Sequence, residues 1–145
     1  MGLVYEENIV DKLDEIVAKQ KGLGERIIKE RGVDWLENNP DKMLQKLVMA
    51  MNDEIAELQR ETNWKWWVNP QEIDIEACKE ELIDILHFNL QALILLGCDS
   101  EEIFNLYVGK NEENHDRQDG NTDRKGYNVN SDEEYKNVEG KYDNR

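Results

Sequence analysis

The sequence has few of the residues that cross-link or stiffen a small secreted domain. It contains two cysteines and two prolines. Cys78 and Cys98 lie far apart and match no zinc-binding spacing, and two cysteines make no disulfide framework, so a reducing, cytoplasmic location is expected. The N-terminal stretch has no basic segment followed by an apolar one, and no run of about 18 apolar residues occurs. We therefore expect neither a secretory signal nor a membrane span.

Basic residues are also scarce. The chain has 18 Lys and Arg against 33 Asp and Glu, which gives a formal net charge of −15. A general nucleic-acid binder needs a basic surface to neutralise phosphates, so we expect no nucleic-acid polymer as a partner. The imbalance is uneven, because residues 71–102 hold nine acidic residues and one basic residue, Lys79. Acidic side chains at this density require solvent or bound cations.

Apolar residues recur at helical rather than at strand spacing, which predicts an all-α fold. Helices are expected over residues 6–20, around Ile27 and Ile28, and over 40–62, 72–96 and 100–115. Gly22 and Gly24 separate the first two, and Asn-Pro pairs precede the third and the fourth. The 72–96 helix is apolar all round in its second half, so we expect it to be central and buried, with part of its surface against a second subunit. Residues 1–127 form the expected domain, and 128–145 a polar, mobile tail.

Two acidic pairs are the most informative motif. Glu54 and Glu57 lie in one expected helix, and Glu81 and Asp84 in the next, each pair at i, i+3. This spacing places both carboxylates of a pair on one helix face, and antiparallel packing of the two helices would bring the pairs together. Hard cations such as Mg²⁺ stabilise such a cluster. Single Glu-x-x-Glu pairs are also common on solvated helices. A di-iron bundle would need two Glu-x-x-His motifs, and the chain offers only Asp84-x-x-His87.

A second candidate motif lies in the last expected helix. Lys110, Asn114 and Arg117 have i, i+4 and i, i+3 spacing, so they share one face. Two cations with an amide between them suit a polyphosphate. A solvated helix end with alternating charges is the other interpretation of this stretch.

The runs EIAELQRETNWKWW, ELIDILHF, YVGKNEENHDRQ and GY together resemble the dimeric all-α dUTPases, relatives of the MazG-like nucleotide pyrophosphatases, over residues 13–127. The resemblance implies a helical bundle with antiparallel metal-binding helices, assembled as a homodimer. It implies Mg²⁺-dependent hydrolysis of dUTP, and also of dUDP, to dUMP, with release of pyrophosphate or phosphate, which limits uracil in DNA. Mg²⁺, or Mn²⁺ in its place, would be held by Glu54, Glu57, Glu81 and Asp84. Glu57 would also orient or deprotonate the attacking water.

The resemblance assigns the remaining site residues as well. Phosphate contacts would come from Lys110, Asn114, Arg117, Lys125 and Tyr127, although the insertion GNTDRK before the Gly-Tyr departs from the family pattern. Base and sugar contacts would come from Gln20, Trp64, Phe88, His87 and Asn111. The aromatic residues have a second interpretation as core or dimer interface, which we favour for Trp67, and His87 has one as a core histidine. Gly24 stands where family members often carry Asn or Asp, so that contact is missing.

Two alternatives to dUTP hydrolysis remain at this point. One is a related pyrophosphatase that acts on dCTP or on a modified nucleotide. The other is a helical interaction protein, because phage members of this family can bind regulatory proteins.

Overall fold

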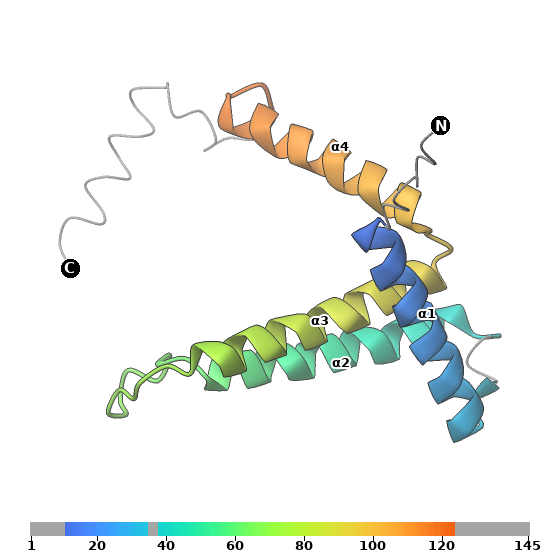
Figure 1. Cartoon of the computed structure of the whole chain (residues 1–145). Coiled ribbons are helices and arrows are strands. Elements are labelled where there is room, and N and C mark those ends of the chain that lie inside the picture. The colour runs from blue at the N-terminus through green and yellow to red at the C-terminus, as the bar shows by residue number, and fades with distance from the viewer. Residues whose placement is uncertain (1–10, 35–37, 124–145) are drawn as a thin grey trace, which may run out of the picture. The chain divides into compact units, whose positions relative to one another are not determined.

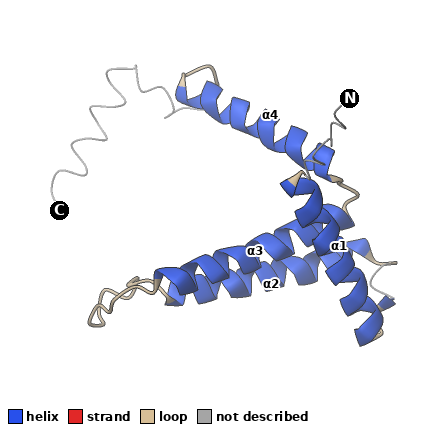
Figure 2. Ribbon diagram, viewed as in Figure 1, coloured by secondary structure: helices blue, strands red, loops and turns tan. Residues whose placement is uncertain are grey.

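The computed structural model describes residues 11–34 and 38–123, and these residues form helices and loops without a strand (Figure 2). The four helices are α1 (Lys12–Arg31), α2 (Pro40–Arg60), α3 (Ile75–Leu95) and α4 (Ser100–Gln118). The predicted all-α fold is therefore confirmed. The chain divides into two compact units, Met1–Ser100 and Glu101–Arg145, so that α1 to α3 belong to the first and α4 lies almost wholly in the second.

Local sequence signals explain where the helices begin and end. The Asp11 side chain accepts a hydrogen bond from the Leu13 amide at 2.8 Å, and the Asp74 side chain accepts one from the Ala77 amide at 3.0 Å. Both bonds satisfy amides that a helix start leaves without an intrahelical partner. Pro40 occupies the first turn of α2, where its missing N–H costs nothing. Gly32 ends α1 with a φ of 62°, a left-handed conformation that glycine adopts without strain.

The expected break in the first helical region is wrong. α1 runs without interruption through Gly22 and Gly24, where the sequence predicted a helix over 6–20 followed by a short second helix. A helical glycine costs about 1 kcal/mol relative to alanine, which tertiary packing readily offsets. Gly24 is buried, so packing is present at that position. The chain therefore has one helix fewer than expected among its described residues, and residues 6–10 lie outside them.

In the first unit, α2 and α3 lie side by side and antiparallel, joined by the loop between Arg60 and Ile75, and α1 packs across α3 near the end of the pair that is distant from this loop (Figure 1). The buried apolar side chains of the described residues are Leu47 on α2 and Leu90 and Ala92 on α3. The buried core is thus small and lies where the three helices meet.

The prediction that the apolar stretch of α3 is buried holds only in part for the single chain. Leu90 and Ala92 are buried, whereas Leu82, Ile83 and Leu86 are 53%, 51% and 41% exposed. A helix that is apolar all round but half covered leaves a large hydrophobic surface, which monomeric proteins rarely show. No single described helix is long and apolar enough to cross a membrane, and the combination of α3 and α4 passes that criterion only as a bent pair.

Candidate functional site

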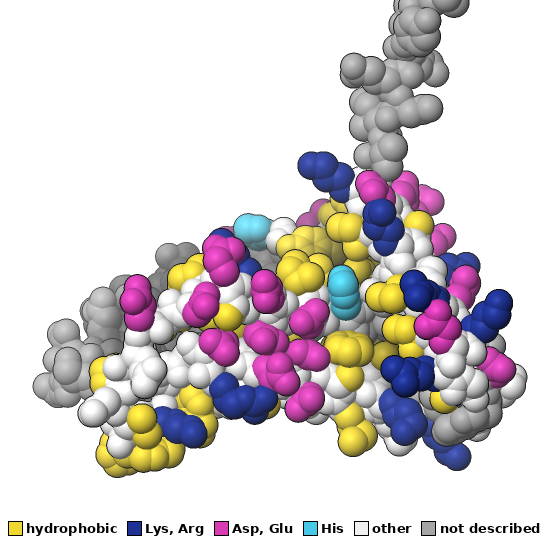
Figure 3. Space-filling model, turned by 60° about the horizontal axis from the view of Figure 1, so that its bottom comes forward, with side chains coloured by type: hydrophobic (Ala, Val, Ile, Leu, Met, Phe, Trp, Pro, Cys, Tyr) yellow, Lys and Arg dark blue, Asp and Glu magenta, His cyan; other side chains and the backbone are white. Residues whose placement is uncertain are grey.

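Three of the four predicted carboxylates converge. Glu54 and Glu57 from α2 and Glu81 from α3 each offer one oxygen, and these oxygens all lie within 4.8 Å of one another. The i, i+3 spacing on α2 and the antiparallel packing of α3 produce this arrangement. Asp84, one turn beyond Glu81, is exposed and does not belong to the cluster of three. Figure 3 shows acidic side chains gathered on one face of the molecule.

The cluster is electrostatically strained. Desolvation raises the pKa of Glu54 above its ordinary value, and the charges of Glu57 and Asp84 and the nearby Glu81 carboxyl raise it further. The Arg60 guanidinium partly compensates this charge, since its Nη2 atom lies 3.6 Å from Glu57 Oε1. Ionised carboxylates at this separation repel one another, so the cluster favours either protonation or a bound cation.

Glu81 gives a second, independent indication that the carboxylate cluster binds a cation. Its Oε2 atom is buried and has no hydrogen-bond partner among the described residues. Buried polar atoms are normally paired, because an unpaired one costs about 1–3 kcal/mol. A donor set made of carboxylate oxygens, with one buried oxygen left over, fits a hard divalent cation such as Mg²⁺ or Mn²⁺.

A cavity of about 490 Å³ adjoins the carboxylates, and all three helices of the first unit line it. Gln20 from α1 and His87 and Phe88 from α3 share this cavity with Glu54 and Asp84. The rest of the wall is mainly apolar, and its members include Leu23, Ile27, Met43 and Leu47. Its size is that of a small-molecule site, and its few polar groups are placed to orient a ligand. Three of the predicted base and sugar residues therefore line the same cavity as two of the predicted metal ligands.

Gln91 is a residue of this cavity that the sequence analysis missed. Gln20 Nε2 donates a hydrogen bond to Gln91 Oε1 at 2.9 Å, and Gln20 is 8% exposed. The Gln91 amide lies directly over Gly24, because a Cβ atom there would lie 2.4 Å from Gln91 Oε1. A signal was available, since Gln91 follows His87 by four residues and Asp84 by seven and is therefore on their face of the helix.

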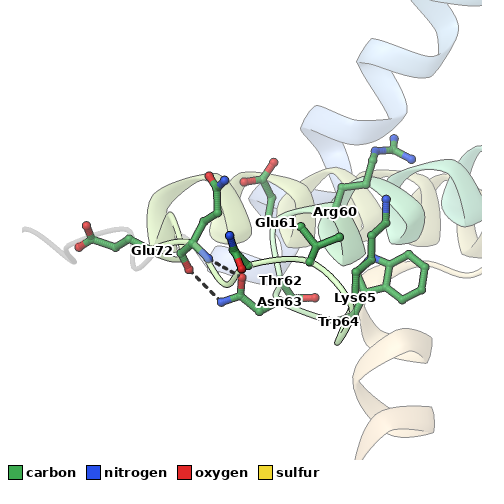
Figure 4. Close-up of a pocket in the computed structure, with 10 residues that line it drawn as sticks. Arg60, Glu61, Thr62, Asn63, Trp64, Lys65 and Glu72 are labelled. Atoms are coloured by element: carbon green, nitrogen blue, oxygen red, sulfur yellow. Dashed lines mark hydrogen bonds between the residues drawn. The ribbon is translucent and has the colours of Figure 1, made fainter.

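Trp64 lies elsewhere, in the loop between α2 and α3. It lines a second cavity of about 400 Å³, together with Arg60, Thr62, Asn63 and Lys65 (Figure 4). The Asn63 side chain fixes this loop through two hydrogen bonds with the Gln71 backbone, one donated to the carbonyl at 2.8 Å and one accepted from the amide at 2.9 Å.

The tryptophans of this loop pack against one another rather than into the core. Trp67 makes edge-to-face contacts with Trp64 and Trp66, with ring centroids 5.7 and 5.6 Å apart. Trp67 is nevertheless 59% exposed. A core position for Trp67 is therefore wrong for the single chain, while a position in a subunit interface stays a prediction.

In the second unit, the predicted phosphate residues share one face of α4 as their spacing requires. Lys110 Nζ lies 2.5 Å from Glu113 Oε2, and Arg117 contacts both Glu113 Oε1 and Asn114 Oδ1, the latter at 3.1 Å. The hydrogen bond from Lys110 is the largest influence and lowers the pKa of Glu113. Desolvation opposes it, and the charges of Arg117 and Lys110 and the hydrogen bond from Arg117 lower the pKa further. Glu113, which the sequence analysis missed, therefore forms ion pairs with both cationic side chains, Lys110 and Arg117.

Asn111 is placed on the same helix and lines a small cavity of about 210 Å³ with Asn114 and Arg117. Lys125 and Tyr127 lie outside the described residues, as does the segment 128–145. The structure therefore leaves their predicted roles untested.

Comparison with known proteins places these elements in a family. Two curated relatives are named dCTP pyrophosphatase, one from Enterobacteria phage T4 and one from Enterobacteria phage LZ5. The first is 41% identical over 68 residues, which is 39% of this chain and 40% of the relative. The second is 56% identical over 41 residues, 28% of this chain and 24% of the relative. The chain thus spans less than half the length of either, and no solved structure matches it.

A family model covers more of the chain. Residues 12–95 match the model of the family described as dUTPase, and this range contains α1, α2, α3 and the carboxylate cluster. The chain belongs to the dUTPase family.

Proposed function

We propose that the chain is a divalent-metal-dependent deoxynucleoside triphosphate pyrophosphatase that hydrolyses dUTP to dUMP and pyrophosphate, and also dUDP to dUMP and phosphate. The observation that carries the proposal is the convergence of Glu54, Glu57 and Glu81, with one buried oxygen unpartnered, beside a cavity that contains Gln20 and Phe88. Membership of the dUTPase family supports the same reaction class.

The carboxylates provide the catalytic half of this site. Glu54, Glu57, Glu81 and Asp84 would hold Mg²⁺, or Mn²⁺ in its place. When bound, the cation would neutralise phosphate oxygens and act as a Lewis acid. Glu57 would hold the attacking water and accept its proton at a carboxylate oxygen while a P–O bond of the polyphosphate breaks. The leaving pyrophosphate carries away the bond's electron pair.

The cavity provides the recognition half. The Phe88 ring would stack on the base, since nucleobases stack well on aromatic faces. Gln20 would hydrogen-bond the base edge and His87 the sugar. Trp64 and Asn111 line other cavities, and their contacts with the nucleotide stay predictions. Lys110, Asn114 and Arg117, with Lys125 and Tyr127, would bind the phosphates. Because Glu113 already pairs with Lys110 and Arg117, a phosphate would have to displace it.

The exposed apolar surface of α3 supports a homodimer as the working form. Leu82, Ile83 and Leu86 lie on the same helix as Glu81 and Asp84, so a second subunit that covered them would also exclude water near the acidic site. We propose a cytoplasmic location for this dimer, where its nucleotide substrates occur.

A second candidate substrate is dCTP. The two phage relatives are named for it, and they match the chain over limited segments. An amide side chain such as that of Gln20 can donate or accept, so the cavity would suit either pyrimidine. A role as a helical interaction protein, including binding of a regulatory protein, remains the alternative outside enzymes.

Incubation of the full chain with each of dUTP, dUDP, dCTP, dTTP, dATP and dGTP tests the proposal. Release of pyrophosphate or phosphate would be followed in Mg²⁺, in Mn²⁺ and after removal of metal by EDTA. We expect turnover of dUTP that EDTA abolishes. Turnover of dCTP well above that of dUTP would transfer the assignment to the second candidate. No turnover of any nucleotide with either metal would refute the enzyme and favour the interaction protein.

A further inference from the structure

Two glutamine side chains from different helices form a pair in the wall of the proposed base cavity. Gln20 on α1 and Gln91 on α3 both line the cavity and share one hydrogen bond of 2.9 Å. Gln20 is buried and Gln91 is half-buried, so water competes weakly for this bond. The pair is the main uncharged polar feature of a largely apolar wall.

The direction of this hydrogen bond determines what Gln20 can offer a ligand. A glutamine amide has a carbonyl end that accepts and an NH₂ end that donates. In the structure the Gln20 NH₂ group donates to the Gln91 carbonyl, so the Gln20 carbonyl is left as an acceptor for the cavity. If both amides flip, Gln91 donates to the Gln20 carbonyl, and the Gln20 NH₂ group is then the one available to a ligand in the cavity. The two amides must flip together, because two carbonyls or two NH₂ groups cannot pair.

Gly24 restricts the position of the Gln91 amide. A Cβ atom at this glycine would lie 2.4, 2.7 and 2.8 Å from Oε1, Nε2 and Cδ of Gln91. The absence of a side chain at residue 24 is therefore what makes room for Gln91 beside Gln20. The Gln91 amide can leave this space, but doing so breaks its hydrogen bond with the buried Gln20.

The two candidate pyrimidines differ in the group that such an amide would read. Uracil carries a carbonyl at C4, which accepts, and cytosine carries an amino group there, which donates. We propose that Gln91 is a positioning residue that sets the choice between a uracil and a cytosine nucleotide by fixing the orientation of the Gln20 amide. This inference rests on the proposed nucleotide hydrolysis. For a Gln20 amide that meets the group at C4, its carbonyl suits the amino group of cytosine and its NH₂ group suits the carbonyl of uracil.

Three substitutions at residue 91 separate the orientations. At pH 8.5 the carboxylate of Gln91→Glu only accepts, so it locks the Gln20 NH₂ group onto itself and leaves the carbonyl for the base. The ammonium of Gln91→Lys only donates, so it holds the Gln20 carbonyl and leaves the NH₂ group. Gln91→Met keeps the approximate volume without a strong hydrogen-bonding group and leaves Gln20 free to adopt either orientation.

The measurement is kcat/KM for dUTP and for dCTP in each variant and in the wild-type chain, with circular dichroism to verify folding. We expect Gln91→Glu to shift the ratio of dCTP to dUTP upward by about tenfold and Gln91→Lys to shift it downward by about tenfold, the effect of one misdirected hydrogen bond. Gln91→Met should bring the ratio toward one. A merely structural role would lower kcat/KM for both nucleotides alike.

The outcomes are distinguishable from those of the proposed function. If the wild-type chain hydrolyses neither nucleotide, the proposed function falls and this inference falls with it. If the wild-type chain is active and the ratio stays unchanged in the variants that fold, the inference alone is overturned. Gln91→Met keeps the test available if either charged variant does not fold, because an unchanged ratio in that variant also overturns it.

Discussion

Two glycines of α1 provide a matched test of how the helices pack. Gly22 and Gly24 both lie inside the helix, and nothing lies within 4 Å of a Cβ atom built at Gly22. Alanine is favoured over glycine inside a helix by about 0.5–1 kcal/mol. Gly22→Ala should therefore raise the free energy of unfolding by about this amount.

Gly24→Ala should behave differently, because its Cβ would lie 2.4–2.8 Å from the Gln91 amide. That amide is the end of a flexible side chain, so it can move, but movement breaks its bond with the buried Gln20. Leaving a buried polar group unpaired costs about 1–3 kcal/mol, which cancels or exceeds the helix gain. We expect the free energy of unfolding of Gly24→Ala to lie about 1–3 kcal/mol below that of Gly22→Ala.

Urea denaturation monitored by circular dichroism measures this difference. The protein concentration must be the same for both variants, because self-association makes the apparent stability depend on it. Equal stabilisation by the two alanines would mean that the hydrogen bond between Gln91 and Gln20 does not contribute to stability. In a Gln91→Ala background, which already lacks the partner of Gln20, adding Gly24→Ala should raise the free energy of unfolding by the helix gain, because the collision is then absent.

Three further predictions follow from the charges and surfaces. Mg²⁺ should raise the melting temperature, because a ligand at a hundred times its dissociation constant stabilises the folded state by about 2.7 kcal/mol. An equal rise in a double variant, Glu54→Gln with Glu81→Gln, would contradict binding at the carboxylate cluster. The lowered pKa of Glu113 means that its carboxylate stabilises α4 above the ordinary value of 4.5, and that this contribution is lost as the pH falls through the lower folded value. Circular dichroism from pH 6 to 3 should therefore show a smaller acid loss of helix in Glu113→Gln than in the wild-type chain, and identical transitions would count against the ion pairs. Ile83→Glu should shift the proposed dimer to a monomer in sedimentation experiments, because it places a charge in the exposed apolar face of α3. A dimer that persists in this variant would exclude that face from the interface.

Spacing within one helix was the most reliable source of site predictions. Glu54 and Glu57 share a face because of their i, i+3 positions, and Lys110 and Arg117 meet at Glu113 for the same reason. Such relations depend on helix geometry alone, so they can be read before the fold is known. The convergence of Glu81 with the α2 pair required one further step, the antiparallel turn between α2 and α3.

Contacts between distant segments could not be read in this way. Gln20 and Gln91 are 71 residues apart, and their hydrogen bond depends on how α1 crosses α3. The same contact explains why the break at Gly24 was predicted wrongly, since the local glycine penalty is visible in the sequence and the compensating packing is not. The sequence indicated that part of this apolar helix surface faces a second subunit, but it did not show that Leu82 and Ile83 are the exposed residues, because an apolar pattern does not show which chain covers each side chain.

The proposed role of the α2 and α3 carboxylates in hydrolysis can be tested by comparing two acidic residues of α2. Pyrophosphate release from dUTP in Mg²⁺ would be measured for the wild-type chain, for Glu57→Gln and for Asp53→Asn, an exposed acid of α2 outside the cluster. We expect Glu57→Gln to lose about 10²-fold or more in kcat with unchanged helicity, while Asp53→Asn stays within about twofold of wild type. Full activity in Glu57→Gln, or an equal loss in both variants, would contradict the proposed role.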